Sequence, residues 1–463
     1  MAANELHKAL AVAELDQLER QEKHLVERLS KIRKAIEAQK LKIDDLARPT
    51  INDLPTELLS QIFTLCISDP KFTEESLHWI AVVSRRWRDV VWNNASFWTS
   101  IKVTQMQCRK SLKKQLERSR KALLTIWIEG WDYRPNDVYD KFRALLDAIV
   151  PHANRWRSLT IDTDSMEQEF VESFLTEFNH LSIPFLREFS MITGVPFDDP
   201  PGPYPNFLSP ARTPALQHLT LKPPFQLDTF MALPTLKTLH LKFAKADHPP
   251  PVILMLAPAQ LLTSLVLNGD STGWSLKRDD LHLPLLDHLT LYLNTPVPFL
   301  EAIVAPKLRY VRCRFYNPLE FNTIEGKFGD VHDLTLEFCQ CEVDDRGAES
   351  LCRAFPGVRQ VELLARDAPF FMASMGHGSG VLERRPPIDQ WLKLETVTLR
   401  GVGLPFLEHW ELDDPIVKWL RDRQESGLSR LCVRLPQIKT DGDRLSTYYA
   451  LLGRYCMLDT FST

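Results

Sequence analysis

Leucine and isoleucine recur at spacings of three and four residues near the start of the chain. They occupy two positions of a seven-residue repeat: Leu15, Leu29, Ile36 and Ile43 at one, and Leu18, Leu25, Ile32 and Leu46 at the other. Glu22 and Gln39 also fall on this seam. The pattern predicts a long helix over residues 1–47 with a narrow apolar stripe, typical of a coiled coil. So narrow a stripe cannot bury itself, so the helix needs a partner. That partner is a second copy of the chain, another protein or the chain's own body.

Residues 48–103 are rich in tryptophan and show helical spacing twice. The first stripe is formed by Leu58, Ile62 and Leu65, soon after Pro55 and Glu57, which suit the first turn of a helix. In the helix expected next, apolar residues again recur at helical spacing: Ile80, Val83, Trp87 and Val90. The segment therefore predicts a small helical domain with one helix running through residues 80–90.

The pattern L-x-x-L-x-L recurs along residues 151–463. Clear copies start at Leu216, Leu236, Leu262 and Leu286, with looser ones at Trp156, Leu186, Leu308, Val331, Val358, Leu394 and Leu428. Consecutive clear copies are 20, 26 and 24 residues apart, the period of leucine-rich repeats. Each copy predicts a short strand whose aliphatic side chains share one interior. The usual asparagine after the strand is missing, so we expect an irregular leucine-rich-repeat solenoid over 151–463, with a helical or strand linker over 104–150. The fold class is α/β.

Side chains alternate along a strand, so the positions flanking the middle leucine face the concave surface. The residues predicted to bind a protein there are His218, His240, His288, Tyr310, Arg312 and Asp333. Positions one step beyond the last aliphatic residue, among them Tyr292, Arg314 and Glu337, continue that face. Histidine, tyrosine and arginine together suit protein interfaces. For any single residue, the alternative is an ordinary solvated strand face.

The segment Leu54-Pro55-x-Glu57-Leu58-Leu59-x-x-Ile62-Phe63, followed by Val83-Ser84-x-x-Trp87-Arg88-x-Val90, resembles an F-box. Ser84 stands where the family usually has cysteine. The stretch 95–101 is similar to the tryptophan-containing segment that closes many F-boxes, and pieces over 116–126 and 152–159 are similar to large fungal F-box families. The resemblance covers residues 49 to about 162.

The resemblance implies a substrate-recruiting subunit of a Skp–cullin–F-box ubiquitin ligase. The adaptor-binding residues it implies are Leu54, Pro55, Leu58, Leu59, Ile62, Phe63, Val83 and Trp87. The F-box would dock a Skp-type adaptor, and through it a cullin–RING core, while the repeats hold a protein substrate. Catalysis would then be proximity alone, so we expect no enzymatic activity and no cofactor in this chain. Without the resemblance, the same residues read as a small helical core or as the cap of a scaffolding repeat protein.

Composition adds only exclusions. The 463 residues carry 56 basic and 60 acidic side chains, a net charge of −4, which gives no reason to expect nucleic acid or an anionic membrane as a partner. Eight scattered cysteines and the absence of a signal-peptide core predict a cytoplasmic or nuclear protein. Cys339-x-Cys341 with Cys352 lacks the spacing of a structural zinc site, so no metal is expected. An enzyme is the third class, supported only by scattered histidines and cysteines.

Overall fold

The computed structural model divides the chain into two compact units, Met1–Asn94 and Ala95–Thr463, and each is described by itself. The structure describes residues 2–47, 51–68, 74–131, 137–162, 168–192, 207–221, 233–243, 255–272, 274, 276–315, 321–338, 345–372, 385–401, 414–437 and 443–461.

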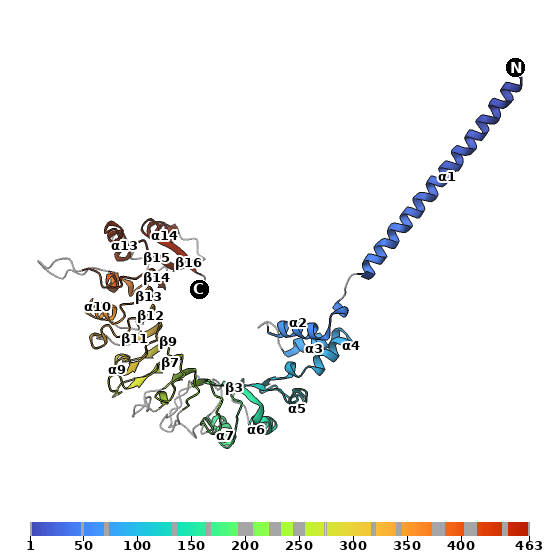
Figure 1. Cartoon of the computed structure of the whole chain (residues 1–463). Helices are drawn as coiled ribbons and strands as arrows, with labels where there is room; N and C mark the ends of the chain where they lie inside the picture. The colour runs from blue at the N-terminus through green and yellow to red at the C-terminus, as the bar shows by residue number, and fades with distance from the viewer. Residues whose placement is uncertain are drawn as a thin grey trace. The chain divides into compact units, whose positions relative to one another are not determined.

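The first unit begins with one helix, α1 (Ala2–Ala47), which confirms the long helix expected from the seam (Figure 1). Neither glycine nor proline interrupts it, in keeping with its high content of good helix formers. Every side chain that the structure describes on α1, from residue 4 to residue 43, is exposed. The described seam residues are 49–58% exposed, so the apolar stripe has no partner within these residues.

The small domain that follows consists of η1 (Ile51–Asp53), α2 (Thr56–Ser68), α3 (Glu74–Val83) and α4 (Arg85–Asn93). The prediction of one helix through residues 80–90 is wrong, because Ser84 divides it. Ser84 has an extended backbone, and its hydroxyl accepts a hydrogen bond from the backbone N–H of Trp87 at 3.1 Å. Serine is among the strongest helix N-caps, so this one residue ends α3 and starts α4.

The second unit is built on a parallel sheet of fourteen strands in which hydrogen-bonded neighbours follow each other in the chain order β1-β2-β3-β4-β5-β6-β7-β9-β11-β12-β13-β14-β15-β16. Its strands are β1 (Ser100–Val103), β2 (Leu124–Ile128), β3 (Trp156–Asp162), β4 (Glu188–Ile192), β5 (His218–Leu221), β6 (Thr238–Lys242), β7 (Ser264–Gly269), β9 (His288–Leu293), β11 (Tyr310–Phe315), β12 (Asp333–Phe338), β13 (Gln360–Leu364), β14 (Thr396–Arg400), β15 (Cys432–Pro436) and β16 (Met457–Phe461). Two short strands, β8 (Leu281–His282) and β10 (Ile303–Val304), pair with each other.

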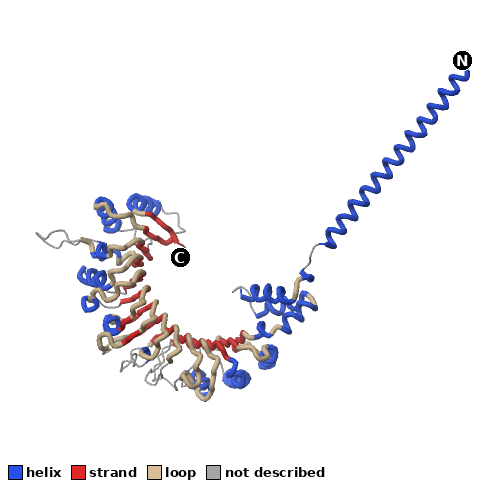
Figure 2. Tube along the Cα trace, viewed as in Figure 1, coloured by secondary structure: helices blue, strands red, loops and turns tan. Residues whose placement is uncertain are grey.

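Helices occupy the connections between strands and lie on one side of the row of strands (Figure 2). They are α5 (Arg109–Arg118), α6 (Asp137–Ile149), α7 (Gln168–Phe178), α9 (Val297–Ala302), α10 (Asp345–Ala354), α11 (Ala368–Met372), α13 (Pro415–Glu425) and α14 (Asp443–Tyr455), with short 3-10 turns η2 (Ala95–Trp98), η3 (Val150–Arg155), η4 (Asn322–Ile324) and η5 (Pro387–Gln390). A strand that leads through a helical connection to a parallel neighbour is the usual way to cover one face of such a sheet.

The repeated leucines form the core of this unit. In the four clear copies the leading leucine and the two that follow are 0–3% exposed. The register aligns them across strands, with Leu239 between Leu219 and Leu265, and Leu289 beyond Leu265. The intervening side chains of β5, β6 and β7 are less buried, as the alternation predicts. The strands expected from these copies are therefore confirmed.

Two ends of the sheet differ from the expectation. The sheet starts at β1 and β2, before residue 151, within segments that we assigned to the F-box and to a linker. The copy expected to start at Leu428 is shifted, since Val433 pairs with Val397 and Leu428 is 48% exposed. Arg430 therefore takes the leading position, and the buried residues of the copy are Leu431, Val433 and Leu435.

Candidate functional site

Four of the residues predicted to bind an adaptor lie on the outside of the small helical domain. Pro55 is exposed, and Leu58, Ile62 and Val83 are 44%, 39% and 61% exposed. Leu54 and Trp87 are partly buried. Leu59 and Phe63 are buried, at 0% and 2%. The predicted set therefore separates into an outer group and a group that builds the domain.

The helical period of α2 produces this separation. Leu58, Ile62 and Leu65 are four and three residues apart and share the outer face of the helix. Leu59 and Phe63 directly follow Leu58 and Ile62 in the sequence, so they lie on the adjacent face of the helix and point inward. The Phe63 ring packs against the Trp87 indole of α4, with ring centroids 4.9 Å apart. Phe63 thus holds α2 to α4, and a surface contact through Leu59 or Phe63 would first require the domain to open.

Arginines of α4 fix the segment that precedes α2. The Arg86 guanidinium donates a hydrogen bond to the Leu54 carbonyl oxygen, and Arg88 Nε donates to the Ala81 carbonyl oxygen at 3.2 Å. The first bond ties the segment before α2, which includes Leu54 and Pro55, to α4. The second ties the end of α3, which carries Val83, to α4. Pro55 and Leu58 are therefore presented on a fixed backbone rather than on a free loop.

The end of α3 carries exposed apolar side chains that the sequence analysis did not select. Trp79 and Val82 are 66% and 50% exposed, next to the predicted Val83. Their spacing of three and four residues is the signal that could have indicated them. Exposed clusters of large apolar side chains usually mark interaction sites.

On the sheet, the structure brings together three of the six predicted substrate-binding residues. His288, Tyr310 and Asp333 are direct partners on the adjacent strands β9, β11 and β12. The imidazole and phenol rings are stacked, 4.2 Å apart and 7° from parallel. Partial burial raises the pKa of Asp333, although nearby His332 and His288 oppose the shift.

The other three lie apart from this group. His218 is in the same row as His288 but is separated from it by β6 and β7, and its Nδ1 is 2.8 Å from Thr238 Oγ1. His240 lies on β6, and Arg312 lies on β11 in the next row along the strands. The six residues therefore share one side of the sheet without forming a single pocket.

Arg312 belongs to a charged cluster with Tyr292, Arg314 and Glu337, which spans β9, β11 and β12. Glu337 accepts hydrogen bonds from Arg312 Nε at 3.0 Å and from Arg314 Nη2 at 2.6 Å. The Arg314 guanidinium lies 4.8 Å from the centre of the Tyr292 ring. Partial burial raises the pKa of Glu337, but the hydrogen bonds from both arginines outweigh it and hold the pKa below its ordinary value.

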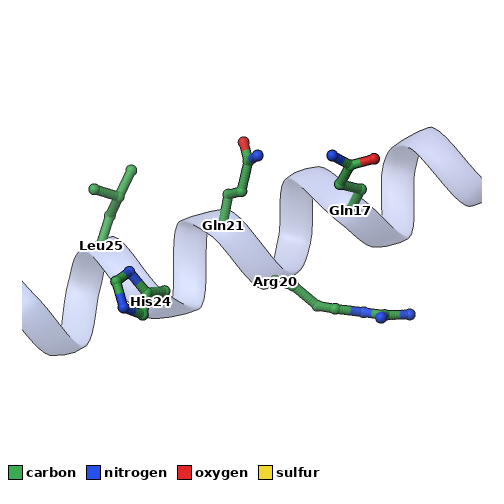
Figure 3. A pocket seen from close by; sticks show the side chains of 5 residues that line it. All are labelled: Gln17, Arg20, Gln21, His24 and Leu25. Carbon is green, nitrogen blue, oxygen red and sulfur yellow. The ribbon is translucent and has the colours of Figure 1, made fainter.

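Metal-binding groups and reactive thiols were the remaining candidates on the described part of the chain. No three His, Cys, Asp or Glu side chains among these residues are grouped so as to hold a metal ion. Burial raises the pKa of the Cys313 and Cys352 thiols, which keeps them neutral. Cys339 and Cys341 lie outside the described residues. The hollow on α1 shown in Figure 3 is lined by one helix alone, at Gln17, Arg20, Gln21, His24 and Leu25, so it cannot enclose a small molecule.

The comparison with protein families agrees with the small helical domain. An F-box-like family model matches residues 51–104, which contain η1 and helices α2–α4 with their exposed apolar face. The match supports binding of a Skp-type adaptor of ubiquitin ligases. No curated protein sequence matches the chain. None of the helices in the described ranges is long and apolar enough to cross a membrane.

Proposed function

We propose that this protein is the substrate-recruiting subunit of a Skp–cullin–F-box ubiquitin ligase. The observation that carries the proposal is the F-box-like match at residues 51–104, together with the outward-facing apolar side chains of α2 within it. Covering this solvent-exposed stripe of leucine and isoleucine with a partner removes apolar surface from water and so stabilises the complex.

In this proposal the adaptor covers Pro55, Leu58, Ile62 and Val83. Leu59 and Phe63 contribute indirectly, since they hold α2 against α4 and so fix the exposed stripe. Leu54 and Trp87, which are partly buried, contribute at the edge of the contact.

The parallel sheet is, in this proposal, an irregular leucine-rich-repeat solenoid, and its helix-free face holds a substrate protein. Two groups on that face have the chemistry of protein contacts: the His288–Tyr310 stack beside Asp333, and the arginine pair with Tyr292 and Glu337. Both sit on hydrogen-bonded strands, so the substrate meets a preorganised surface.

The chain would supply no reacting group. It would hold the substrate near a ubiquitin-charged enzyme that the cullin core brings, in the cytoplasm or the nucleus, and the gain in rate would come from effective concentration. The alternative is a scaffolding protein that docks the adaptor through the same surface without any ubiquitylation.

The test is co-expression of the full chain with its cognate Skp-type adaptor. We expect a complex that survives purification, and its loss in the variant Leu58→Asp/Ile62→Asp. The control is Leu392→Asp, which places one aspartate on a leucine that is 88% exposed in the second unit and should leave binding unchanged. Circular dichroism checks that all three proteins fold.

Each outcome decides between the alternatives. A folded native chain that ignores the adaptor contradicts the proposal. An adaptor complex that never assembles with a cullin favours the scaffolding protein. Equal binding by the native chain and by Leu58→Asp/Ile62→Asp would move the contact away from α2.

A further inference from the structure

The seam of α1 is a long apolar stripe that the described residues leave uncovered, and the charges beside it indicate what covers it. Seven seam residues, each at least 49% exposed, follow one another along the helix: Leu15, Leu18, Leu25, Leu29, Ile32, Ile36 and Ile43. A stripe of this kind is stable when another helix packs its own stripe against it.

Side chains that flank the seam are divided by sign along the helix. The first half carries acidic residues at the flanking positions, namely Glu5, Glu14 and Glu19. The second half carries basic residues there, namely Arg28, Arg33, Lys40 and Lys42. Flanking residues of one helix contact those of its partner, so this division sets which orientation two copies prefer.

A parallel pair of copies would bring like charges together. Glu14 and Arg28 directly precede a seam residue, and such residues contact the one five positions further along the second copy, so Glu14 faces Glu19 and Arg28 faces Arg33. Residues on the seam face their own counterparts, so the Glu22 carboxylates of the two copies would meet between the helices. Two carboxylates buried side by side cannot both stay ionised without a large cost.

An antiparallel pair reverses each of these contacts. With the two helices overlapping along their full length, Glu14 of one copy lies beside Arg28 of the second, and Glu19 lies beside Arg33. On the seam, Leu18 packs against Leu29 of the second copy and Leu15 against Ile32. Glu22 then packs against Leu25, so the two Glu22 side chains lie in adjacent layers of the seam and no longer face each other within one layer.

We propose that α1 pairs with α1 of a second copy of this chain as an antiparallel coiled coil. A paired chain carries two F-box-like domains and two sheets, so a substrate with two recognition segments would bind with avidity. The inference does not rest on the proposed ligase function, because it uses only residues of α1.

The first part of the test asks whether the seam pairs the full chain. Sedimentation equilibrium at micromolar concentration should give the mass of a dimer. The variant Leu18→Glu/Leu29→Glu should give a monomer, since it places charge on the seam. The control Leu10→Glu/Leu41→Glu changes two leucines that are 60% and 67% exposed but lie off the seam, and should remain dimeric. Glutamate and leucine both favour helix, so α1 itself persists.

The second part asks for the orientation. At low salt, Glu14→Lys/Glu19→Lys should weaken the dimer roughly tenfold or more, and so should Arg28→Glu/Arg33→Glu, because each places like charges side by side. All four substitutions together exchange the signs on both sides and should restore the dimer. A parallel pair would show neither effect, because its flanking contacts stay like-charged in every variant.

Several results would overturn the inference. These are a monomeric native chain, a tetramer, a dimer that survives Leu18→Glu/Leu29→Glu, and a dimer lost in the Leu10→Glu/Leu41→Glu control. A dimer that is insensitive to the charge variants overturns the antiparallel orientation. None of these results depends on adaptor binding, which is measured separately with the Leu58→Asp/Ile62→Asp variant.

Discussion

Leucine is exposed to solvent in α1 and buried in the sheet. Leucines of the helix seam are 53–58% exposed, whereas those of the four clear L-x-x-L-x-L copies are 0–3% exposed. In the sheet, each strand pairs with the next strand of its own chain, so each leucine of these strands lies between two buried residues of the neighbouring strands, as Leu219 lies between Phe189 and Leu239. The helix has only one stripe, and within the described residues nothing covers it.

This contrast shows which part of the molecule can bury its apolar side chains without a partner. The period of the apolar pattern determines whether a segment forms a helix or a strand. Whether its apolar side chains are buried depends on how many copies of the pattern the chain contains. A repeated pattern can be buried against itself, and a single seam must be buried against something else. Helix α2 stands between these cases, with Leu59 and Phe63 facing inward and Leu58 and Ile62 facing out.

The difference between buried and exposed leucines is tested most directly by truncating one leucine in each region. Leu289→Ala should lower the free energy of unfolding of the second unit by about 2–5 kcal/mol, because it leaves a cavity between strands. Leu18→Ala in α1 should leave that value unchanged. Urea unfolding followed by tryptophan fluorescence reports mainly on the second unit, which holds eight of the eleven tryptophans, among them the buried Trp131, Trp156 and Trp391. The small helical domain holds the other three, and α1 holds none.

Equal losses in the two variants would contradict the assignment of α1 and the sheet to separate units. A loss well below 1 kcal/mol in Leu289→Ala would mean that the leucine rows of the sheet are not packed as tightly as their burial indicates.

A smaller effect is expected where α3 gives way to α4. Ser84→Ala removes the hydroxyl that caps α4 and should cost about 1 kcal/mol, while Ser84→Asp keeps an acceptor at the same position and should cost little. Hydrogen exchange measured by mass spectrometry on peptides from α4 should be roughly fivefold faster in Ser84→Ala. Equal exchange in Ser84→Ala and the native chain would show that the cap does not hold α4.

Much of the fold could be predicted because its signals are local. The seam of α1 and the alternation of buried and open positions in β5, β6, β7 and β9 are properties of neighbouring residues. Strand β1 was not predicted and β2 was expected only as part of a linker, since Ile101 and Val103 or Leu124 and Ile126 alternate without a leading leucine. The break at Ser84 was missed because helical spacing continues on both sides of a single capping residue.

The candidate sites were less predictable, since they depend on what lies across from each side chain. Helix α2 has apolar residues on two faces, and only the position of Trp87 decides that Phe63 is the inner one. The stack of His288 on Tyr310 and the sharing of Glu337 by Arg312 and Arg314 depend on the register between strands. The register follows the alignment of the copies that start at Leu286, Leu308 and Val331, but that alignment does not specify which side chains of adjacent rows stack or share a hydrogen-bond partner.

The smallest effect we expect concerns Glu337, and it depends on pH. Its pKa is lowered in the folded chain, so the carboxylate contributes stability that is present above the unfolded pKa of about 4.3 and is lost as the pH falls through the lower folded value. Glu337→Gln should therefore be less stable than the native chain at pH 7, and the difference should shrink steadily below about pH 4. The measurement is the free energy of unfolding of both proteins in urea between pH 7 and pH 3. The control is Glu188→Gln, which removes an exposed carboxylate from β4 and should show little difference at any pH. A Glu337→Gln penalty that stayed constant over this range would show that Glu337 acts through its shape and hydrogen bonds rather than through its charge on the two arginines.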